Sequence, residues 1–237
     1  MAQTLPSRAT EKELLARYSR RAGRSVNLAG VDEVGRGAIA GPVGVGICVV
    51  DANTDDGFPC RLRDSKLLSP RMRQNLAEPC IQWVKAAAVG YAEAPEIDRY
   101  GIVGAMQIAA ARGAEDLRAR GITLDLVLLD GSHDWWSAPT LFADMPLPPA
   151  LPVQTEVKGD ARCAVVAAAS VLAKVGRDKI MEDLSQSYPA YGWEKNKGYA
   201  TKAHIAGIGR AGLSAQHRKS WKIPGVKQGG SDNNRVV

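Results

Sequence analysis

The sequence has few cysteines, and none of them has the spacing of a metal site. The four cysteines form no C-x-x-C pair, and none lies near a histidine at the spacing of a zinc ligand set. We interpret them as separate thiols of a protein in a reducing compartment. They are Cys48, Cys60, Cys80 and Cys163.

Long apolar runs are also lacking. Residues 1–10 contain no apolar stretch of the kind found in a secretory signal, and no run approaches the length of a membrane span. There is no internal repeat and no linker long enough to demand a second domain. We therefore expect a cytoplasmic protein whose 237 residues form one large domain or at most two small ones.

What the sequence does contain is an excess of positive charge. The formal net charge is +6 and the isoelectric point is about 9.2. This balance favours a polyanionic partner such as a nucleic acid. Charge alone does not separate such a protein from a basic protein that binds no anion.

The most informative stretch runs from Ala29 to Val43 and lies between two apolar segments. The first segment ends in adjacent carboxylates, Asp32 and Glu33, and a glycine-framed arginine follows at 35–37. Glycines at such a turn allow the backbone of a ligand to come close. We interpret the stretch as the centre of a metal-dependent nuclease site, which requires further acids elsewhere in the chain.

Hydrophobic periodicity predicts alternating strands and helices. Expected strands are Leu28–Val34, Val43–Val50, Ala86–Ala92, Leu124–Leu129 and Val153–Val157. Expected helices are Glu11–Arg24, Pro70 to about Ala77, Pro95–Arg120, Ala161–Leu184 and Thr201–Ala211. Ser69 is the predicted N-cap of the second helix, and Gly101 and Gly104 weaken the start of the third, so that it could form two pieces. Residues 1–10 and the chain past Pro224 are expected to be flexible. The pattern predicts an α/β fold: a mixed sheet with helices on its faces.

Three predicted strands end in acids. Asp32 and Glu33 follow one, Asp130 follows another and Asp160 follows a third. Ligands of open α/β sheets gather at strand ends, so these four carboxylates could converge. Two unit charges about 4 Å apart repel by roughly 4 kcal/mol at an effective dielectric near 20, so either one acid protonates or divalent cations neutralise the cluster. Oxygen ligands favour Mg²⁺ or Mn²⁺, and two such ions are the usual machinery for displacement at phosphorus.

Each acid also has a purely structural interpretation. Asp32 and Glu33 could be solvated residues at a strand end, and Asp130-Gly131 could form a turn. Asp160 could be the N-cap of the helix that follows it. Spacing alone does not prove that the acids converge.

The glycine-rich stretch also partly matches a dinucleotide-binding motif. Residues 35–41 are near the G-x-G-x-x-G pattern but contain one extra residue, and Pro42 stands where a helix should continue. The sequence has no Walker A pattern. An oxidoreductase of the Rossmann type is therefore disfavoured.

Several motifs in this order resemble ribonuclease HII. They are DEVGRG at 32–37, DSK at 64–66, LLDG at 128–131, KGD at 158–160, AASVLAK at 168–174 with Arg177-Asp178, and Gly198-Tyr199 with His204. The resemblance covers about residues 28–215. It implies a ribonuclease H-like fold with a mixed five-stranded sheet flanked by helices, and a small helical C-terminal extension.

The resemblance also implies an activity. The family cuts the RNA strand of RNA–DNA hybrids and cuts at single ribonucleotides in duplex DNA, leaving 5′-phosphate and 3′-hydroxyl ends, as in ribonucleotide excision repair. By resemblance, the catalytic and metal-binding acids are Asp32, Glu33, Asp130 and Asp160, with two Mn²⁺ or Mg²⁺ ions in the working complex. The expected substrate-binding residues are Gly35, Arg36, Gly37, Lys66, Ser170, Lys174 and Tyr199.

Physical chemistry is compatible with these substrate roles. Glycine lets main-chain groups reach the 2′-hydroxyl that separates RNA from DNA, arginine matches phosphate in a bidentate way, and a tyrosine ring offers a stacking surface. Without the resemblance, a turn at Gly35–Gly37, a solvated Lys66 and a packed surface Tyr199 would explain the same residues.

The expected domain division is residues 1–27 as tail and short basic helix, 28–185 as catalytic domain, 186–223 as helical substrate-binding part and 224–237 as flexible tail. We expect a monomer and see no clamp-binding motif in the tail. Residues 132–136 depart from the family pattern, and the role of His133, Trp135 and Trp136 is left open, with a loop packed by its tryptophans favoured. Asp178 is expected to be a structural partner of Lys174.

Overall fold

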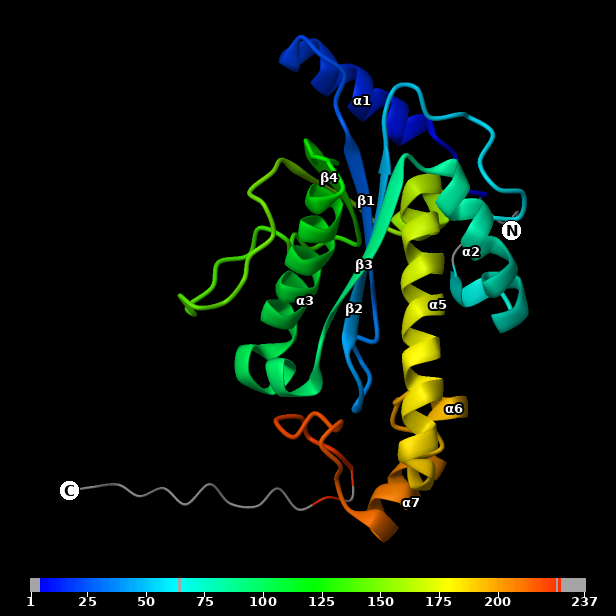
Figure 1. Cartoon of the computed structure of the whole chain (residues 1–237), viewed down its shortest axis with the longest axis vertical. Coiled ribbons are helices and arrows are strands. Elements are labelled where there is room, and N and C mark those ends of the chain that lie inside the picture. The colour runs from blue at the N-terminus through cyan, green and yellow to red at the C-terminus, as the bar shows by residue number, and fades with distance from the viewer. Residues whose placement is uncertain (1–4, 64, 225, 227–237) are drawn as a thin grey trace, which may run out of the picture.

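The computed structural model describes residues 5–63, 65–224 and 226, and its strands form a five-stranded mixed sheet in the order β3-β2-β1-β4-β5 (Figure 1). The strands are β1 (Leu28–Val34), β2 (Val43–Val50), β3 (Ala86–Ala92), β4 (Leu126–Asp130) and β5 (Val153–Glu156). β1, β2 and β3 pair antiparallel, whereas β1, β4 and β5 run parallel. The predicted mixed sheet is confirmed. No helix among the described residues is long and apolar enough to cross a membrane.

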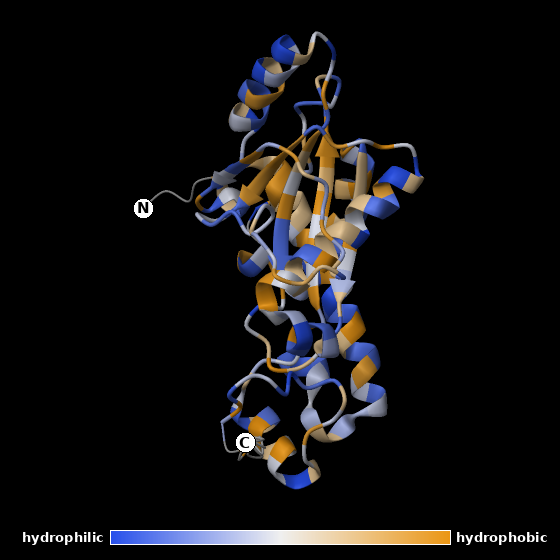
Figure 2. Cartoon of the chain, turned by 90° about the vertical axis from the view of Figure 1, so that its left-hand side faces the viewer, coloured by the Kyte–Doolittle hydropathy of each residue, from blue (hydrophilic) through white to orange (hydrophobic). Residues whose placement is uncertain are grey.

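The helices cover both faces of this sheet. They are α1 (Ala9–Ala22), α2 (Pro70–Trp83), α3 (Ala94–Ala119), α4 (Gly159–Arg162), α5 (Ala164–Ser187), α6 (Trp193–Asn196) and α7 (Lys202–Ala211), with short 3₁₀ turns at Ser65–Leu67 and Pro189–Tyr191. One hydrophobic core lies between the sheet and α5, α2 and α1. A second core lies on the other face of the sheet, beneath α3 and the buried Trp135 and Trp136. Figure 2 shows the apolar residues concentrated in the strands and in the helix faces that meet them.

Close approach of helix to sheet depends on glycine at two positions. A methyl group on Gly46 of β2 would collide with the carbonyl of Ala169 in α5, and one on Gly90 of β3 would collide with the carbonyl of Ala109 in α3. Both sheet faces are therefore in backbone-to-backbone contact with a helix, which fixes the position of α5 beneath the strand ends.

A third core lies beyond the sheet and forms a small C-terminal lobe. It joins Ile39 and Ala40, from the turn between β1 and β2, to Met181 near the end of α5 and to Trp193 and Ile208 of the lobe. α5 runs from the sheet into this lobe (Figure 1). The turn that carries the Gly-Arg-Gly sequence is therefore part of both halves of the molecule.

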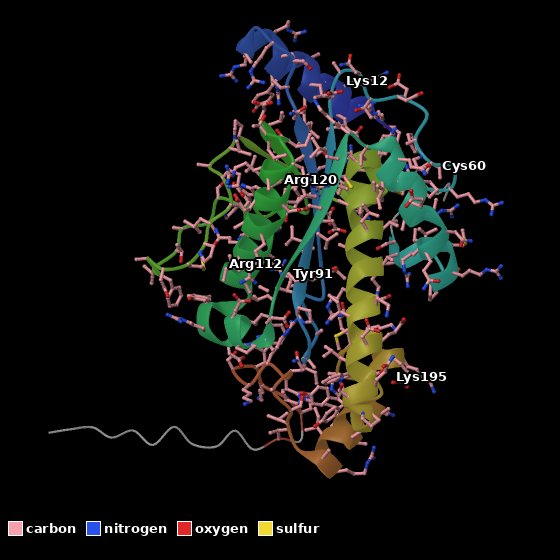
Figure 3. The ribbon with its side chains drawn as sticks, viewed as in Figure 1. Lys12, Cys60, Tyr91, Arg112, Arg120 and Lys195 are labelled. Carbon is pink, nitrogen blue, oxygen red and sulfur yellow. The ribbon has the colours of Figure 1, made fainter. Side chains whose placement is uncertain are left out.

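The outer edge of β3 is capped by two arginines, one in α3 and one at its C-cap position. Arg112 donates to the carbonyl of Tyr91 at 2.7 Å, and Arg120 donates to the carbonyl of Ala87 at 2.7 Å (Figure 3). These side chains occupy acceptors that would otherwise be available to another strand.

Residues 5–10, predicted to be flexible, are instead part of the packed structure. Arg8 is buried and pairs with Glu11, whose carboxylate accepts the N–H of Val165 at 2.7 Å. Glu11 thus satisfies an N–H in the first turn of α5, a helix whose own N-cap residue provides no side-chain bond. The sequence prediction missed this because a cap supplied by a distant residue has no local signature.

Other boundaries differ for local reasons. α2 continues past Ala77 to Trp83 and includes Pro79, and the predicted helix 161–184 is two helices separated at Cys163. α3 is kinked at Gly101, whose φ of 71° is non-helical, so the alternative of two pieces is confirmed. The predicted tail past Pro224 lies largely outside the described residues.

Candidate active site

The predicted acids meet at one end of the sheet. β1 and β4 are parallel neighbours in which Val31 lies opposite Leu129, so Asp32 and Asp130 follow side by side. Asp160, at the start of α4, is joined to them because its N–H donates to a carboxylate oxygen of Asp130 at 3.3 Å. Asp160 is not the N-cap of a helix, since Lys158 holds that position in α4.

The four carboxylates interact electrostatically. Burial raises the pKa of Asp32 well above its ordinary value, and the charges of Asp130, Glu33 and Asp160 raise it further. Burial and then the charge of Asp130 also raise the pKa of Glu33, which Arg36 partly offsets. The cluster is therefore a site of concentrated negative charge that favours a cation.

Ser170 of α5 lies directly against this cluster. Its side chain is 3% exposed, it hydrogen bonds to Asp32, and its Oγ is 2.8 Å from the Oγ of Ser65. The hydrogen bond to Ser170 acts against the rise in the pKa of Asp32. The hydroxyl thus helps to keep a buried carboxylate ionised and oriented.

Basic side chains surround the acids. Nζ of Lys66 is 3.5 Å from Asp160, and a guanidinium nitrogen of Arg36 is 3.5 Å from Glu33. Both side chains are at least half exposed and can turn toward a ligand. Lys174 is mostly buried and pairs with Asp178, which confirms the expected partnership; burial lowers the pKa of Lys174.

The two glycines of the Gly-Arg-Gly turn differ in whether the fold could accept a side chain in their place. Gly35 has φ of +78°, and a methyl group there would overlap the guanidinium of Arg177. Gly37 has no such φ, and nothing lies within 4 Å of the place where its Cβ would be. The fold therefore requires glycine at 35 but not at 37, which leaves the space at Gly37 open to a ligand.

Tyr199 belongs to the C-terminal lobe but is tied to this turn. The carbonyl of the preceding Gly198 accepts the N–H groups of Ile39 and Ala40, and the carbonyl of Tyr199 lies 2.9 Å from Nδ1 of the buried His204. The ring is 39% exposed. An exposed aromatic surface is thus fixed beside the Gly-Arg-Gly turn.

Sequence reasoning missed the arginines beneath the turn. Arg177 enters the sequence analysis only as part of the Arg177-Asp178 motif, but in the structure it is fully buried and donates to main-chain carbonyls. Arg218 was not singled out at all, because an arginine in a basic C-terminal stretch has the signature of a solvated residue. No local sequence pattern identifies an arginine whose partners are carbonyls more than 170 positions away.

The loop after the third acid is built around its tryptophans. Trp135 and Trp136 are both 2% exposed, and Nε1 of Trp136 donates to the carbonyl of Pro149. His133 and Asp134 are exposed, and Asp134 accepts the N–H of Ser137. The favoured interpretation of a packed loop agrees with this arrangement.

The donor set suits a hard divalent cation, since it consists of carboxylate oxygens. Within the described part of the chain, no three Asp, Glu, His or Cys side chains form a ready-made metal cage. The fit to a metal therefore comes from the donor chemistry and from the mutual repulsion that raises the pKa of Asp32. An apolar hollow of about 760 Å³ between α2, β3 and α5 includes none of the predicted site residues.

Comparisons with known proteins bear on the family and the fold of the chain. A family model described as Ribonuclease HII matches residues 29–223. The ribonuclease HII of Streptomyces avermitilis is 42% identical over 194 residues, which cover 82% of this chain and 76% of that protein. The crystal structure of ribonuclease H2 from Pyrococcus horikoshii OT3 aligns with a TM-score of 0.63 and 29% identity, covering 84% of this chain and 95% of that one. Bst-RNase HIII in complex with Mn²⁺ aligns at a TM-score of 0.59 and 18% identity over 79% of this chain and 63% of that one, which is a likeness of fold alone.

Proposed function

The chain belongs to the ribonuclease HII family, and from this premise we propose how it acts as an endoribonuclease on RNA–DNA hybrids. We propose that it hydrolyses the RNA strand of such hybrids and also cuts at single ribonucleotides embedded in duplex DNA. Water attacks phosphorus and the bond to O3′ breaks, which leaves a 5′-phosphate and a 3′-hydroxyl. This activity would serve the removal of ribonucleotides from DNA.

The observation that carries the proposal is the electrostatic convergence of four carboxylates beside an open glycine turn. Asp32, Glu33, Asp130 and Asp160 would hold two divalent ions, for which the Mn²⁺ in the Bst structure is a precedent. When bound, the ions activate the attacking water and stabilise the leaving oxygen. The hydrogen bond from Ser170 helps to keep the carboxylate of Asp32 ionised and in place for this role.

Substrate recognition is assigned to the groups around the acids. The main chain at Gly35–Gly37 reads the ribose 2′-hydroxyl, Arg36 binds the adjacent phosphate and Tyr199 stacks on the next sugar. Lys66, Lys174 and the Ser170 face of α5 contribute to phosphate binding.

The proposed parts of the chain follow from these roles. Residues 28–185 hold the chemistry, 186–223 bind substrate through Tyr199, and 1–27 support the start of α5. The proposed tail, residues 224–237, lies largely outside the described residues. We propose that the enzyme works as a monomer in the cytoplasm.

The first prediction tests the catalytic cluster. Asp130→Asn should lower cleavage of a duplex containing one ribonucleotide by about a thousandfold, because lost charge stabilisation of several kcal/mol corresponds to that factor. The assay compares Mg²⁺, Mn²⁺ and EDTA, and circular dichroism verifies folding. Asp134→Asn is the matched control, since Asp134 lies in the adjoining loop and caps Ser137. Full activity of folded Asp130→Asn, or tight binding without cleavage by the wild type under every ion, would refute the assignment.

The second prediction tests the glycine turn. Gly37→Ala should leave the melting temperature within about 2 °C, because nothing in the folded chain lies within 4 Å of the new methyl group. Its kcat/KM on the single-ribonucleotide duplex should nevertheless fall about tenfold or more, because a methyl group blocks close approach of the sugar. Unchanged kinetics would remove Gly37 from the recognition site.

A further inference from the structure

Two fully buried arginines lie beneath the Gly-Arg-Gly turn. Arg177 of α5 and Arg218 of the segment after α7 are both 0% exposed. Neither forms an ion pair with a described residue, and Asp98 and Asp178 attract them only from a greater distance. Burial and the charge of Arg177 lower the pKa of Arg218 to about 9, which reflects the cost of placing two cations together out of water.

Both guanidinium groups donate to the main chain of residues 35–42. Arg218 donates to the carbonyls of Gly35 at 2.7 Å, Arg36 at 3.0 Å, Gly41 at 3.1 Å and Pro42 at 3.2 Å. Its N–H also donates to the carbonyl of Ile39. One side chain therefore holds the inner surface of the whole turn.

Arg177 of α5 adds further hydrogen bonds to the same turn. It donates to the carbonyl of Pro42 at 2.8 Å, to that of Ala40 at 3.1 Å and to that of Lys197 at 2.8 Å. It thereby links the turn to the lobe that carries Tyr199. Since a methyl group on Gly35 would overlap this guanidinium, the arginine and the glycine require each other.

The direction of these hydrogen bonds determines what the turn presents on its outer surface. In a trans peptide the C=O of one residue and the N–H of the next point in opposite directions, and the described chain contains no cis peptide. Because Arg218 holds the carbonyls of Gly35 and Arg36 inward, the N–H groups of Arg36 and Gly37 point outward. Within the described chain, neither of these N–H groups donates a hydrogen bond.

We propose that Arg218, together with Arg177, is a positioning residue that fixes two successive peptide planes so that the N–H groups of Arg36 and Gly37 are aimed at the ribose of the substrate. This inference rests on the proposed function, in which this turn reads the 2′-hydroxyl. The arginines do not touch the substrate. They determine the orientation of the groups that do, and their multiple carbonyl contacts require the five donors of a guanidinium, which lysine lacks.

The test separates ribose recognition from general duplex binding. For each variant, kcat/KM is measured on a duplex with one ribonucleotide, and Ki is measured for the all-DNA duplex of the same sequence as competitor, both in Mg²⁺. In Arg218→Lys, kcat/KM should fall about tenfold or more, because misaligned donors lose one or two hydrogen bonds to the sugar. Ki should stay within about twofold, because the positive charge is retained and the all-DNA duplex has no 2′-hydroxyl to read. Equal changes in kcat/KM and Ki, or no change in either, would overturn the inference.

Arg8→Met is the matched control for loss of a buried arginine. Arg8 is also buried and donates to main-chain carbonyls, those of Asp51, Thr54 and Asp55, but it lies at the start of α1. This variant should lower the melting temperature and leave kcat/KM and Ki unchanged. A loss of ribose-dependent activity in Arg8→Met equal to that in Arg218→Lys would show that general destabilisation is the cause.

A milder variant covers the case in which Arg218→Lys does not fold. Asp98 of α3 accepts the N–H groups of Lys219 and Ser220 and the hydroxyl of Ser220, and so holds the segment next to Arg218. Asp98→Ala should lower kcat/KM about threefold with Ki unchanged; an unchanged kcat/KM would contradict the inference.

If the wild type does not cleave, or if Gly37→Ala behaves as wild type, the proposed function fails. If those results are as expected and Arg218→Lys equals wild type, only the positioning role fails.

Discussion

At the scale of single residues, the carboxylates of the site repel one another, and the fold holds them close despite this repulsion. Asp32 is 5% exposed and its pKa is raised by burial and by three neighbouring acids, so its charged form destabilises the fold when no cation is bound. Ser170 offsets part of this cost by a hydrogen bond. A carboxylate that we propose to act in catalysis is therefore one that weakens the folded state.

Replacing this carboxylate should therefore stabilise the protein. In EDTA at pH 7, Asp32→Asn should raise the melting temperature by about 2–4 °C, equivalent to about 1 kcal/mol in a domain of this size, while abolishing cleavage. The pKa of Asp32 is raised in the folded state, so the folded state binds its proton more firmly and the destabilisation grows as pH rises above the ordinary Asp value. The gain should therefore be smaller at pH 4 than at pH 7, as measured by calorimetry. Asp144→Asn, which alters an exposed ion pair with Arg99, should change little, and a lower melting temperature for Asp32→Asn would contradict the argument.

At the scale of secondary-structure elements, the C-terminal segment depends on two buried histidines. Nε2 of His204 lies 3.1 Å from Nε2 of His217 and also accepts the indole N–H of Trp193 at 2.9 Å. Both histidines are 0% exposed, and Tyr191 packs edge-on against each of them. The network supports the stretch between Tyr199 and Arg218, and among the described residues no acidic side chain pairs with either histidine to stabilise a proton.

Acid should destabilise this segment. Burial, and then His204, lower the pKa of His217 to about 4 from an ordinary 6.5, so the unfolded state binds the proton more readily. The stability that depends on a neutral His217 is fully present above pH 6.5 and is lost as pH falls toward 4. At pH 5 the loss in free energy of unfolding is about 2 kcal/mol. Urea unfolding at pH 7.5 and pH 5 measures this, with His217→Asn expected to reduce the difference. The exposed His133→Asn should leave it unchanged, and an equal pH response in all three proteins would rule out His217 as its source.

The elements also show which local signals could be read from the sequence. Apolar runs predicted β1, β2 and β3, and the proline at 70 with Ser69 before it predicted the start of α2. The separation of α4 from α5 at Cys163 could not be read, because alanine-rich sequence continues across it and the break serves the approach of Asp160 to Asp130. Local propensity defines elements, whereas their ends respond to tertiary contacts.

At the scale of the whole molecule, the sequence predicted a site formed by acids but did not predict the residues that support it. Strand ends and family motifs located Asp32, Asp130 and Asp160, because each stands next to a recognisable apolar run. The support given by Glu11 to α5 and by Arg218 to the turn spans more than 150 positions of sequence. Such contacts depend on the completed fold and leave no pattern in a single chain.

The positive net charge should appear as salt dependence of duplex binding. If Arg36, Lys66 and Lys174 contact phosphates, the logarithm of the association constant should fall against the logarithm of salt concentration with a slope of about −3. Lys66→Gln should reduce the slope by about one unit, as measured by competition with the all-DNA duplex. Lys12→Gln, at an exposed ion pair with Asp56, is the control and should leave it unchanged. An unaltered slope in Lys66→Gln would exclude Lys66 from phosphate binding.

The helix α5 is continuous between the residues that contact the two proposed parts of the site. Ser170, which hydrogen bonds to the proposed catalytic acid Asp32, and Arg177, which holds the turn proposed to recognise ribose, are seven residues apart on one helix, a rise of about 10 Å. Helix geometry thus fixes the spacing between the proposed point of cleavage and the proposed point of recognition. If both proposed roles hold, the offset between the ribose and the bond that is cut is set by the length of helix between Ser170 and Arg177, and it does not depend on the bases of the duplex.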